Sequence, residues 1–259
     1  MHLAPGNKMI SNGSDSLLYP FWNRLFSFNW KFSLGLALLI CIPRFFLVLQ
    51  ANEIGNYNAI GIIMVLSALT PFLFLTRNGR REAGIVSTKR WSVLLSAFAA
   101  GLGFAVILHF SGMLLYGNTE SNWYNYIGRS YRLPENTNDT DKLVMFAIFA
   151  ITGMSFSPVG EEFFFRAIVH TGFAKSMNEK KASVIDSLLF AFTHLAHFGI
   201  VFINERWHFL FVPALIWVGA MYLVSRIFFY FKEKATSIWG TVICHAGFNL
   251  GMIGAIFYL

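Results

Sequence analysis

An all-α fold, a polytopic transmembrane bundle of seven or eight membrane helices, is predicted by three properties of the sequence. Of the 259 residues, 56% are hydrophobic and only 13% are charged, whereas soluble domains carry about 25% charged residues. Long apolar stretches recur at close to the roughly 20 residues that cross a bilayer. The basic residues fall in short loops between these stretches, so the net charge of +7 indicates membrane topology and argues against a nucleic-acid partner.

Seven apolar stretches are each taken as a membrane helix. They cover residues 32–49, 58–76, 92–115, 143–174, 182–203, 207–231 and 236–258. The fourth is the longest and is interrupted at Pro158 and Gly160. It is therefore either one long kinked helix or a span followed by a separate helix that begins near Val159, and this alternative sets the count at seven or eight.

The charges of the loops alternate along the chain and predict an orientation. The loops after the second, fourth and sixth stretches are basic, with Arg77, Arg80, Arg81, Lys89 and Arg90, then Lys175, Lys180 and Lys181, then Lys232 and Lys234. The other loops carry little net positive charge. The positive-inside rule then places the N-terminus and the three basic loops in the cytoplasm. The small size and the lack of a targeting segment favour the plasma membrane of a bacterium.

The sequence predicts one short N-terminal segment and one membrane domain. Residues 1–30 are expected to form a cytoplasmic or interfacial segment, and residues 31–259 a single transmembrane domain. The polar loop 116–142 is expected outside, partly covering that domain. Cys41 and Cys244 lie far apart in apolar stretches, which predicts neither a disulfide framework nor a cysteine-rich metal site.

Polar groups inside three of the stretches predict a buried site. Ionisable residues at bilayer depth are costly and mark function by default. The groups are Glu161, Glu162 and Arg166 in the fourth stretch, His194 in the fifth, and His245 with Asn249 in the last. From the helical rise, Glu161, His194 and His245 lie about 21, 20 and 17 Å from the basic end of their stretches. A shared depth on three separate helices is what one buried site requires.

Helical spacing suggests a role for each group. Residues four apart share a face of a helix, so Glu162 is expected to pair with Arg166. Glu161 points elsewhere without a partner in its own helix, and an unpaired carboxylate in an apolar setting can take a proton from water. Glu161 is therefore the predicted base. Asn249 shares a face with His245, where it either orients the imidazole or helps to hold an oxyanion.

The neighbouring polar residues receive structural interpretations. Phe190 lies one turn before His194 and is expected to pack against the site. Arg44, next to Pro43, is expected at a kink or reaching for the lipid headgroups. Asp186 is only about 8 Å from the basic end and is expected to be solvated, while His197 is read as structural or interfacial. A single intramembrane His, or one Glu–Arg pair, is more often a structural contact than a catalyst. The prediction of an active site therefore rests on the convergence of three helices at one depth.

These motifs resemble a known family. In order, Glu161-Glu162-x-x-x-Arg166, Phe190-x-x-x-His194 and His245-x-x-x-Asn249 resemble the CAAX protease and bacteriocin-processing (CPBP, Abi) family, over roughly residues 143–255. The resemblance implies an all-helical intramembrane endopeptidase whose cavity opens toward the cytoplasm. By that likeness, Glu161 and His194 activate a water molecule, and His245 and Asn249 stabilise the oxyanion.

The resemblance leaves the use of a metal open. The family is often labelled metalloprotease, and Glu161, His194 and His245 would be the ligands of a divalent metal such as zinc, with a fourth position for water. A glutamate-activated water needs no metal. The carboxylate that could orient a metal ligand is Glu162, which is expected to pair with Arg166, and this slightly favours the metal-free mechanism.

Two functions from different classes follow. The first is an intramembrane endopeptidase that acts on a short peptide or on the tail of a lipidated or membrane-bound protein, with membrane lipids as its other partners. The second is a transporter or a non-catalytic regulator, for instance of bacteriocin immunity or signalling, because intramembrane polar residues also build ion pathways. The chain shows no inverted repeat of the kind many transporters have. The oligomeric state is left open.

Overall fold

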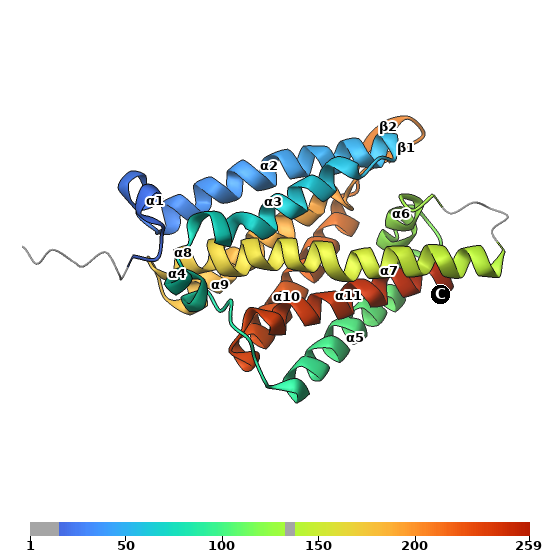
Figure 1. Cartoon of the computed structure of the whole chain (residues 1–259). Coiled ribbons are helices and arrows are strands. Elements are labelled where there is room, and N and C mark those ends of the chain that lie inside the picture. The colour runs from blue at the N-terminus through green and yellow to red at the C-terminus, as the bar shows by residue number, and fades with distance from the viewer. Residues whose placement is uncertain (1–15, 133–137) are drawn as a thin grey trace, which may run out of the picture.

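Seven long helical elements lie side by side in the computed structural model, which describes residues 16–132 and 138–259 (Figure 1). They are α2 (Trp30–Ile54), α3 (Asn58–Phe74), α5 (Trp91–Tyr116), α7 (Asp139–Glu162) continued by the π-helical η1 (Phe163–Val169) and α8 (His170–Ala174), α9 (Glu179–Thr193), α10 (Phe211–Ala235) and α11 (Ile238–Tyr258). Short elements connect them: α1 (Pro20–Leu25), α4 (Arg77–Glu82), α6 (Trp123–Arg129), η2 (His194–Ala196), β1 (Ile200–Ile203) and β2 (Arg206–Phe209). The prediction of an all-α polytopic bundle is confirmed.

Polar residues fix where four of the long helices begin. The side chains of Asn29, Asn138, Asn178 and Ser237 accept backbone N–H groups in the first turns of α2, α7, α9 and α11. Such caps satisfy donors that have no partner within the helix. Five of the helices are long and apolar enough to cross a membrane: α2, α5, α7–α8, α10 and α11. Helices α3 and α9 are shorter, with 17 and 15 residues.

The fourth apolar stretch is one continuous helix. It runs for 36 residues from Asp139 to Ala174, so the alternative of a separate helix beginning near Val159 is wrong. Pro158 lies inside it without ending it. Directly after Glu162 the winding widens into the π-helical turns of η1, a feature that is frequent at functional sites.

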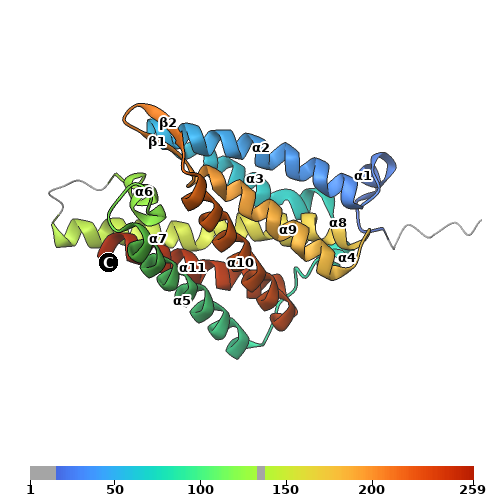
Figure 2. The ribbon, with the colours of Figure 1, turned by 180° about the vertical axis from the view of Figure 1, so that it is seen from behind.

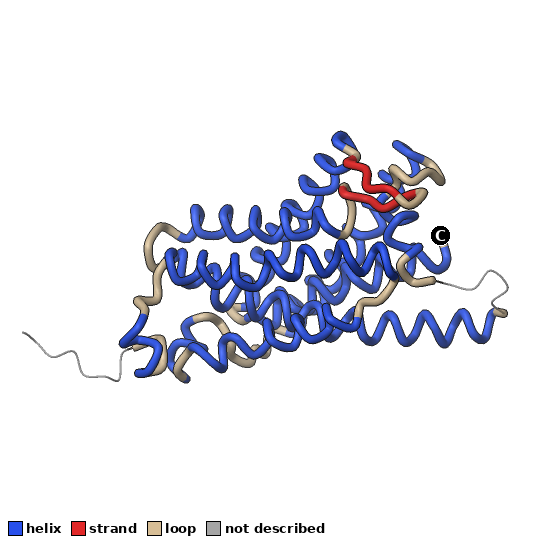
Figure 3. The backbone as a smooth tube through the Cα atoms, turned by 90° about the horizontal axis from the view of Figure 1, so that it is seen from above, coloured by secondary structure: helices blue, strands red, loops and turns tan. Residues whose placement is uncertain are grey.

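The fifth apolar stretch does not form the predicted helix over 182–203. Helix α9 ends at Thr193, Gly199 adopts a positive φ of 116°, and residues 200–209 fold into an antiparallel hairpin, seen in red in Figure 3. Its turn residues Asn204 and Glu205 have φ of 51° and 60°, as two-residue hairpin turns require. A short apolar run such as Ile200–Ile203 does not distinguish strand from helix by hydropathy alone.

The bundle has two distinct ends. The three basic loops meet at one of them, which we call the basic end: Lys175 pairs with Glu82, and Arg90 donates to the carbonyl of Lys234 at 2.8 Å. The hairpin, α6 and the C-terminus lie at the opposite end, the hairpin end, in both Figure 1 and Figure 2. The alternation of loop charges thus corresponds to two opposite ends of the molecule.

The predicted interfacial segment is partly visible. Its residues 1–15 lie outside the described residues, but Trp22 of α1 donates to the carbonyl of Leu73 at 2.8 Å and leaves Phe21 exposed. The loop after α5 covers the domain as predicted, because α6 buries Trp123 and Tyr124 completely or nearly so. Their polar atoms donate to backbone carbonyls of α5.

Close packing holds α11 in the middle of the bundle, against α5, α7 and α10. Small residues allow two helix backbones to approach closely. A Cβ atom at Gly251 would lie 2.9 Å from the carbonyl oxygen of Leu102, and one at Gly101 would collide with the carbonyl of Cys244. This contact fixes α11, which carries two of the predicted site residues.

We expect Gly101→Ala to destabilise the protein, by about 1–3 kcal/mol, because the added methyl group overpacks the α5–α11 contact. The measurement is the apparent melting temperature of the purified protein in detergent. Gly103→Ala is the matched control, since no atom lies within 4 Å of a Cβ built there. Equal melting temperatures for the two variants would contradict the close contact.

Candidate active site

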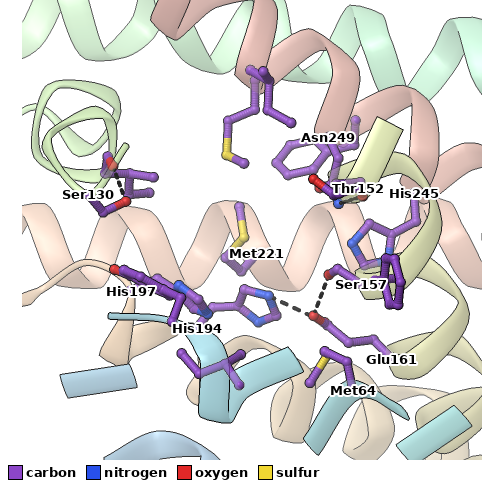
Figure 4. A pocket seen from close by; sticks show the side chains of 18 of the residues that line it. Met64, Ser130, Thr152, Ser157, Glu161, His194, His197, Met221, His245 and Asn249 are labelled. Carbon is purple, nitrogen blue, oxygen red and sulfur yellow. Dashed lines mark hydrogen bonds and ion pairs between the residues drawn. The ribbon is translucent and has the colours of Figure 1, made fainter. Parts of the chain in front are cut away.

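A cavity of about 380 Å³ lies within the bundle, a size usual for ligand-binding pockets. Helices α2, α3, α7, α10 and α11 all contribute to its wall, which is mostly apolar. The side chains of Glu161, His194, His245, Asn249 and Phe190 all line it, and Figure 4 shows several of them around one space. The structure therefore brings together the residues that share a depth in the sequence.

Glu161 is not the unpaired carboxylate that helical spacing suggests. Its Oε1 accepts a hydrogen bond from Arg44 Nη2 at 2.7 Å and another from Ser157 Oγ at 2.8 Å. Its Oε2 has no hydrogen-bond partner among the described residues and faces His194 Nε2 at 3.5 Å. One oxygen is thus anchored, while the other is directed at the imidazole.

Arg44 has a different place from the one predicted. It is 4% exposed and lines the cavity, so the expectation of a kink-site or headgroup-reaching residue is wrong. The pairing is favourable because a buried charge needs a partner. The signal was present in the sequence: from Lys31 to Arg44 the helix rises about 20 Å, which is the depth already assigned to Glu161.

The imidazole of His194 has a defined orientation. Its Nδ1 lies 2.8 Å from the carbonyl oxygen of Phe190, and because a carbonyl only accepts, Nδ1 carries the proton in the neutral ring. Nε2 then presents a lone pair toward Glu161. The ring of Phe190 packs on the imidazole with centroids 4.3 Å apart, as predicted. Phe190 lies in the last turn of α9, and His194 follows this helix directly as the first residue of η2.

His245 is held by a chain of buried ionic groups behind the cavity. Its Nδ1 lies 2.8 Å from Glu162 Oε1, and Glu162 Oε2 lies 2.9 Å from Arg166 Nε. The predicted Glu162–Arg166 pair is therefore present. Arg166 also pairs with Asp186, which is completely buried, so the expectation of a solvated Asp186 is wrong. Glu162 and Arg166 lie outside the cavity wall, and Glu162 contacts the cavity-lining His245.

Asn249 lines the cavity but does not orient the imidazole. Its Nδ2 donates to the carbonyl oxygen of Gly153 at 2.8 Å, and Glu162 takes the orienting position at His245. This leaves the oxyanion role as the remaining interpretation of Asn249. His197, read from the sequence as structural or interfacial, also lines the cavity, with its ring 5.5 Å from that of His194.

The residues as arranged do not fit a metal ion. Within residues 16–132 and 138–259, no group of three or more His, Cys, Asp and Glu side chains is placed to hold one. The Oε1 of Glu161 already accepts the guanidinium of Arg44, whose positive charge would oppose a cation beside it.

The comparisons with known proteins agree with the motifs. The model of a protein family described as "type II CAAX prenyl endopeptidase Rce1-like" matches residues 143–251, a little under half of the chain. No curated protein and no solved structure matches the chain. The matched segment runs from α7 to α11 and contains all of the predicted site residues, so the resemblance is confirmed over that segment, and it indicates a membrane protease.

The pairing of Arg44 with Glu161 can be tested by a double-mutant cycle. Removing one partner of a buried pair leaves an uncompensated charge, which destabilises a protein by about 3–5 kcal/mol. We therefore expect Arg44→Met to lower the apparent melting temperature in detergent strongly. Combining it with Glu161→Gln should recover part of the loss, because the neutral amide needs no cation.

The control for this cycle is Arg77→Met, which changes an exposed residue at the basic end and should leave stability nearly unchanged. Additive effects of the Arg44 and Glu161 substitutions, with no recovery in the double variant, would show that the two side chains do not interact.

Proposed function

We propose that this chain, which matches the Rce1-like family over residues 143–251, is an intramembrane endopeptidase that uses a glutamate-activated water. The observation that supports it most is the approach of Glu161 Oε2 to His194 Nε2 at 3.5 Å on the wall of a largely apolar cavity. Both atoms are hydrogen-bond acceptors, and the distance exceeds that of a direct hydrogen bond. A water molecule that donates to both atoms would be held there in position to attack.

The first chemical step is the activation of this water. Glu161 removes a proton as the water oxygen bonds to the carbonyl carbon of the scissile peptide, and the carbonyl oxygen takes up the negative charge. Arg44 and Ser157 anchor the opposite oxygen of the carboxylate. The base therefore keeps a fixed direction, and such positioning is a large part of what an active site contributes.

The second requirement is a partner for the developing oxyanion. Asn249 and His245 lie on one face of α11 and both line the cavity. Glu162 accepts a hydrogen bond from Nδ1 of His245. The carboxylate would also balance the positive charge of an imidazolium, the protonated ring in which Nε2 donates a hydrogen bond as well. The proton on Glu161 or His194 then passes to the leaving amine as the C–N bond breaks.

The cavity wall suggests the class of substrate. Met64, Phe156, Met221 and Ile253 are among the apolar residues that surround the polar groups. A peptide or protein tail that is bound to the membrane, including a lipidated one, would place apolar groups against this wall. We propose membrane lipids and such a peptide as the partners, and the plasma membrane of a bacterium as the location.

Glu161→Gln and His194→Ala should each lower peptide cleavage by at least about 10²-fold, since a general base contributes roughly 10²–10⁴. Cleavage of candidate membrane-bound peptides is measured with purified protein, per amount of folded material. His208→Ala is the control, because His208 is an exposed histidine on β2. Full activity in both site variants would instead support the transporter or regulator interpretation.

A metal-free mechanism has its own test. Because Arg44 occupies the carboxylate of Glu161, we expect cleavage to continue after treatment with a strong chelator and dialysis. The purified protein should also contain less than one equivalent of zinc by elemental analysis. Loss of activity on chelation, with recovery on adding zinc, would establish a metalloprotease.

A further inference from the structure

A second cavity, also of about 380 Å³, lies at the basic end of the bundle and shares no lining residue with the first. Helices α4, α8 and α9 lie together there (Figure 1), and the connection between α10 and α11 completes the wall. Charged and hydroxyl side chains make up most of this wall, in contrast to the apolar wall of the first cavity. The proposed hydrolysis uses none of its residues.

Lys232 is a buried cation in the wall of this second cavity. It is 8% exposed, and its Nζ donates a hydrogen bond to the carbonyl oxygen of Arg166 at 2.9 Å. No carboxylate among the described residues forms an ion pair with it. An ammonium group has three donors, and a buried charge without a counter-ion is unfavourable. Lys232 therefore has both donors and positive charge available for a ligand.

His170 is a second buried polar side chain in the same wall. Its Nε2 lies 2.8 Å from Glu179 Oε2, whereas its Nδ1 has no hydrogen-bond partner among the described residues. Because a carboxylate only accepts, Nε2 carries a proton, and Nδ1 is an acceptor in the neutral ring or a donor in the imidazolium. A phosphate group has both P–O and P–OH oxygens, so it can pair with either form.

The carboxylates of the wall are exposed, and two of the three are already paired. Glu82 pairs with Lys175 and Glu179 with His170, and the two glutamate side chains are 44% and 70% exposed. Glu233, the third, is also exposed. Water and salt screen exposed charges, whereas a buried charge is screened much less. The charge that dominates inside this cavity is therefore the positive charge of the buried lysine.

We propose that the second cavity binds a phosphate group, carried by a lipid headgroup or by a free phosphate. Lys232 supplies a buried point charge, and the exposed guanidinium of Arg81 in the same wall suits phosphate oxygens. The loops that join membrane helices lie at the level of the lipid headgroups, so both sources can reach this end of the bundle. The binding chemistry is independent of the proposed hydrolysis, although Lys232 also contacts Arg166 of the ionic chain behind His245.

Phosphate binding is measured as a rise in the apparent melting temperature of the purified full chain in a non-ionic detergent. Replacing chloride by inorganic phosphate, at constant pH and ionic strength, should raise it by about 3 °C in a saturable way, because a ligand stabilises the folded state that binds it. Lys232→Met should abolish this rise. Lys234→Met is the matched control, since Lys234 is an exposed lysine outside the cavity wall, and it should retain the full rise.

A second variant tests the site without changing a buried residue, should Lys232→Met fold poorly. Arg81→Met should increase the phosphate concentration at half-maximal rise by about 3-fold, the effect expected for one exposed charge. Arg77→Met, at an exposed position outside the wall, should leave that concentration unchanged. A rise that is the same in Lys232→Met, in Arg81→Met and in the parent protein overturns the site.

Mixed micelles distinguish the two sources of the phosphate. Phosphatidic acid, which carries an exposed phosphate monoester, is compared with phosphatidylcholine at the same content. A Lys232-dependent rise with phosphatidic acid but not with inorganic phosphate assigns the cavity to a lipid headgroup. A Lys232-dependent rise with inorganic phosphate shows that free phosphate suffices. If neither ligand raises the melting temperature of the parent protein, Lys232 only stabilises the end of η1 and the proposal is wrong.

Discussion

Pairing of buried charges is the constraint on which the rest of this structure depends. An unpaired ion in an apolar interior is strongly unfavourable, so each buried carboxylate must meet a cation or several donors. Glu161 meets Arg44 and Ser157, while Glu162 and Asp186 share Arg166. These contacts tie α2, α7–η1 and α9 together. The same pairing that makes the buried charges tolerable also fixes the directions of the side chains that line the cavity.

The two adjacent glutamates consequently perform different tasks. Glu161 faces the cavity and has one oxygen left for chemistry, whereas Glu162 faces the ionic chain and holds His245 from behind. The π-helical turns that begin directly after Glu162 bury Arg166 and offer its carbonyl to Lys232. The wider winding thus connects the cavity to the basic end of the bundle.

The cavity lies to one side of α11, away from its close contact with α5. The small residues of α5 and α11 let these helices approach closely, which leaves space on the other side of α11, between α3, α7 and α10, for the cavity. Because its wall is largely apolar, a segment bound in the cavity would lose contact with water beside Glu161. Excluding water strengthens every electrostatic contact there.

The sequence alone determined the helical bundle, the alternation of the loops and the set of Glu161, His194, His245 and Asn249 as residues of one site. Hydropathy and loop charge are local properties, and the 1.5 Å rise converts positions along a helix into depth. The sequence did not determine which charged side chains pair with each other. Arg44 and Asp186 stand far from Glu161 and Arg166 in the chain, and depth gives no rotation about the bundle axis, so these pairs exist only once the helices are packed.

The same limit explains the hairpin and the shape of the site. Residues 200–203 are as apolar as a membrane helix, and only the turn at Asn204 and Glu205 with the pairing of β1 and β2 makes them a strand. Spacing correctly joined Glu162 to Arg166 because both lie on one helix face. It left Glu161 unpaired because its partner comes from another helix. Contacts within a helix follow from periodicity, whereas contacts between helices depend on the tertiary packing that places their faces together.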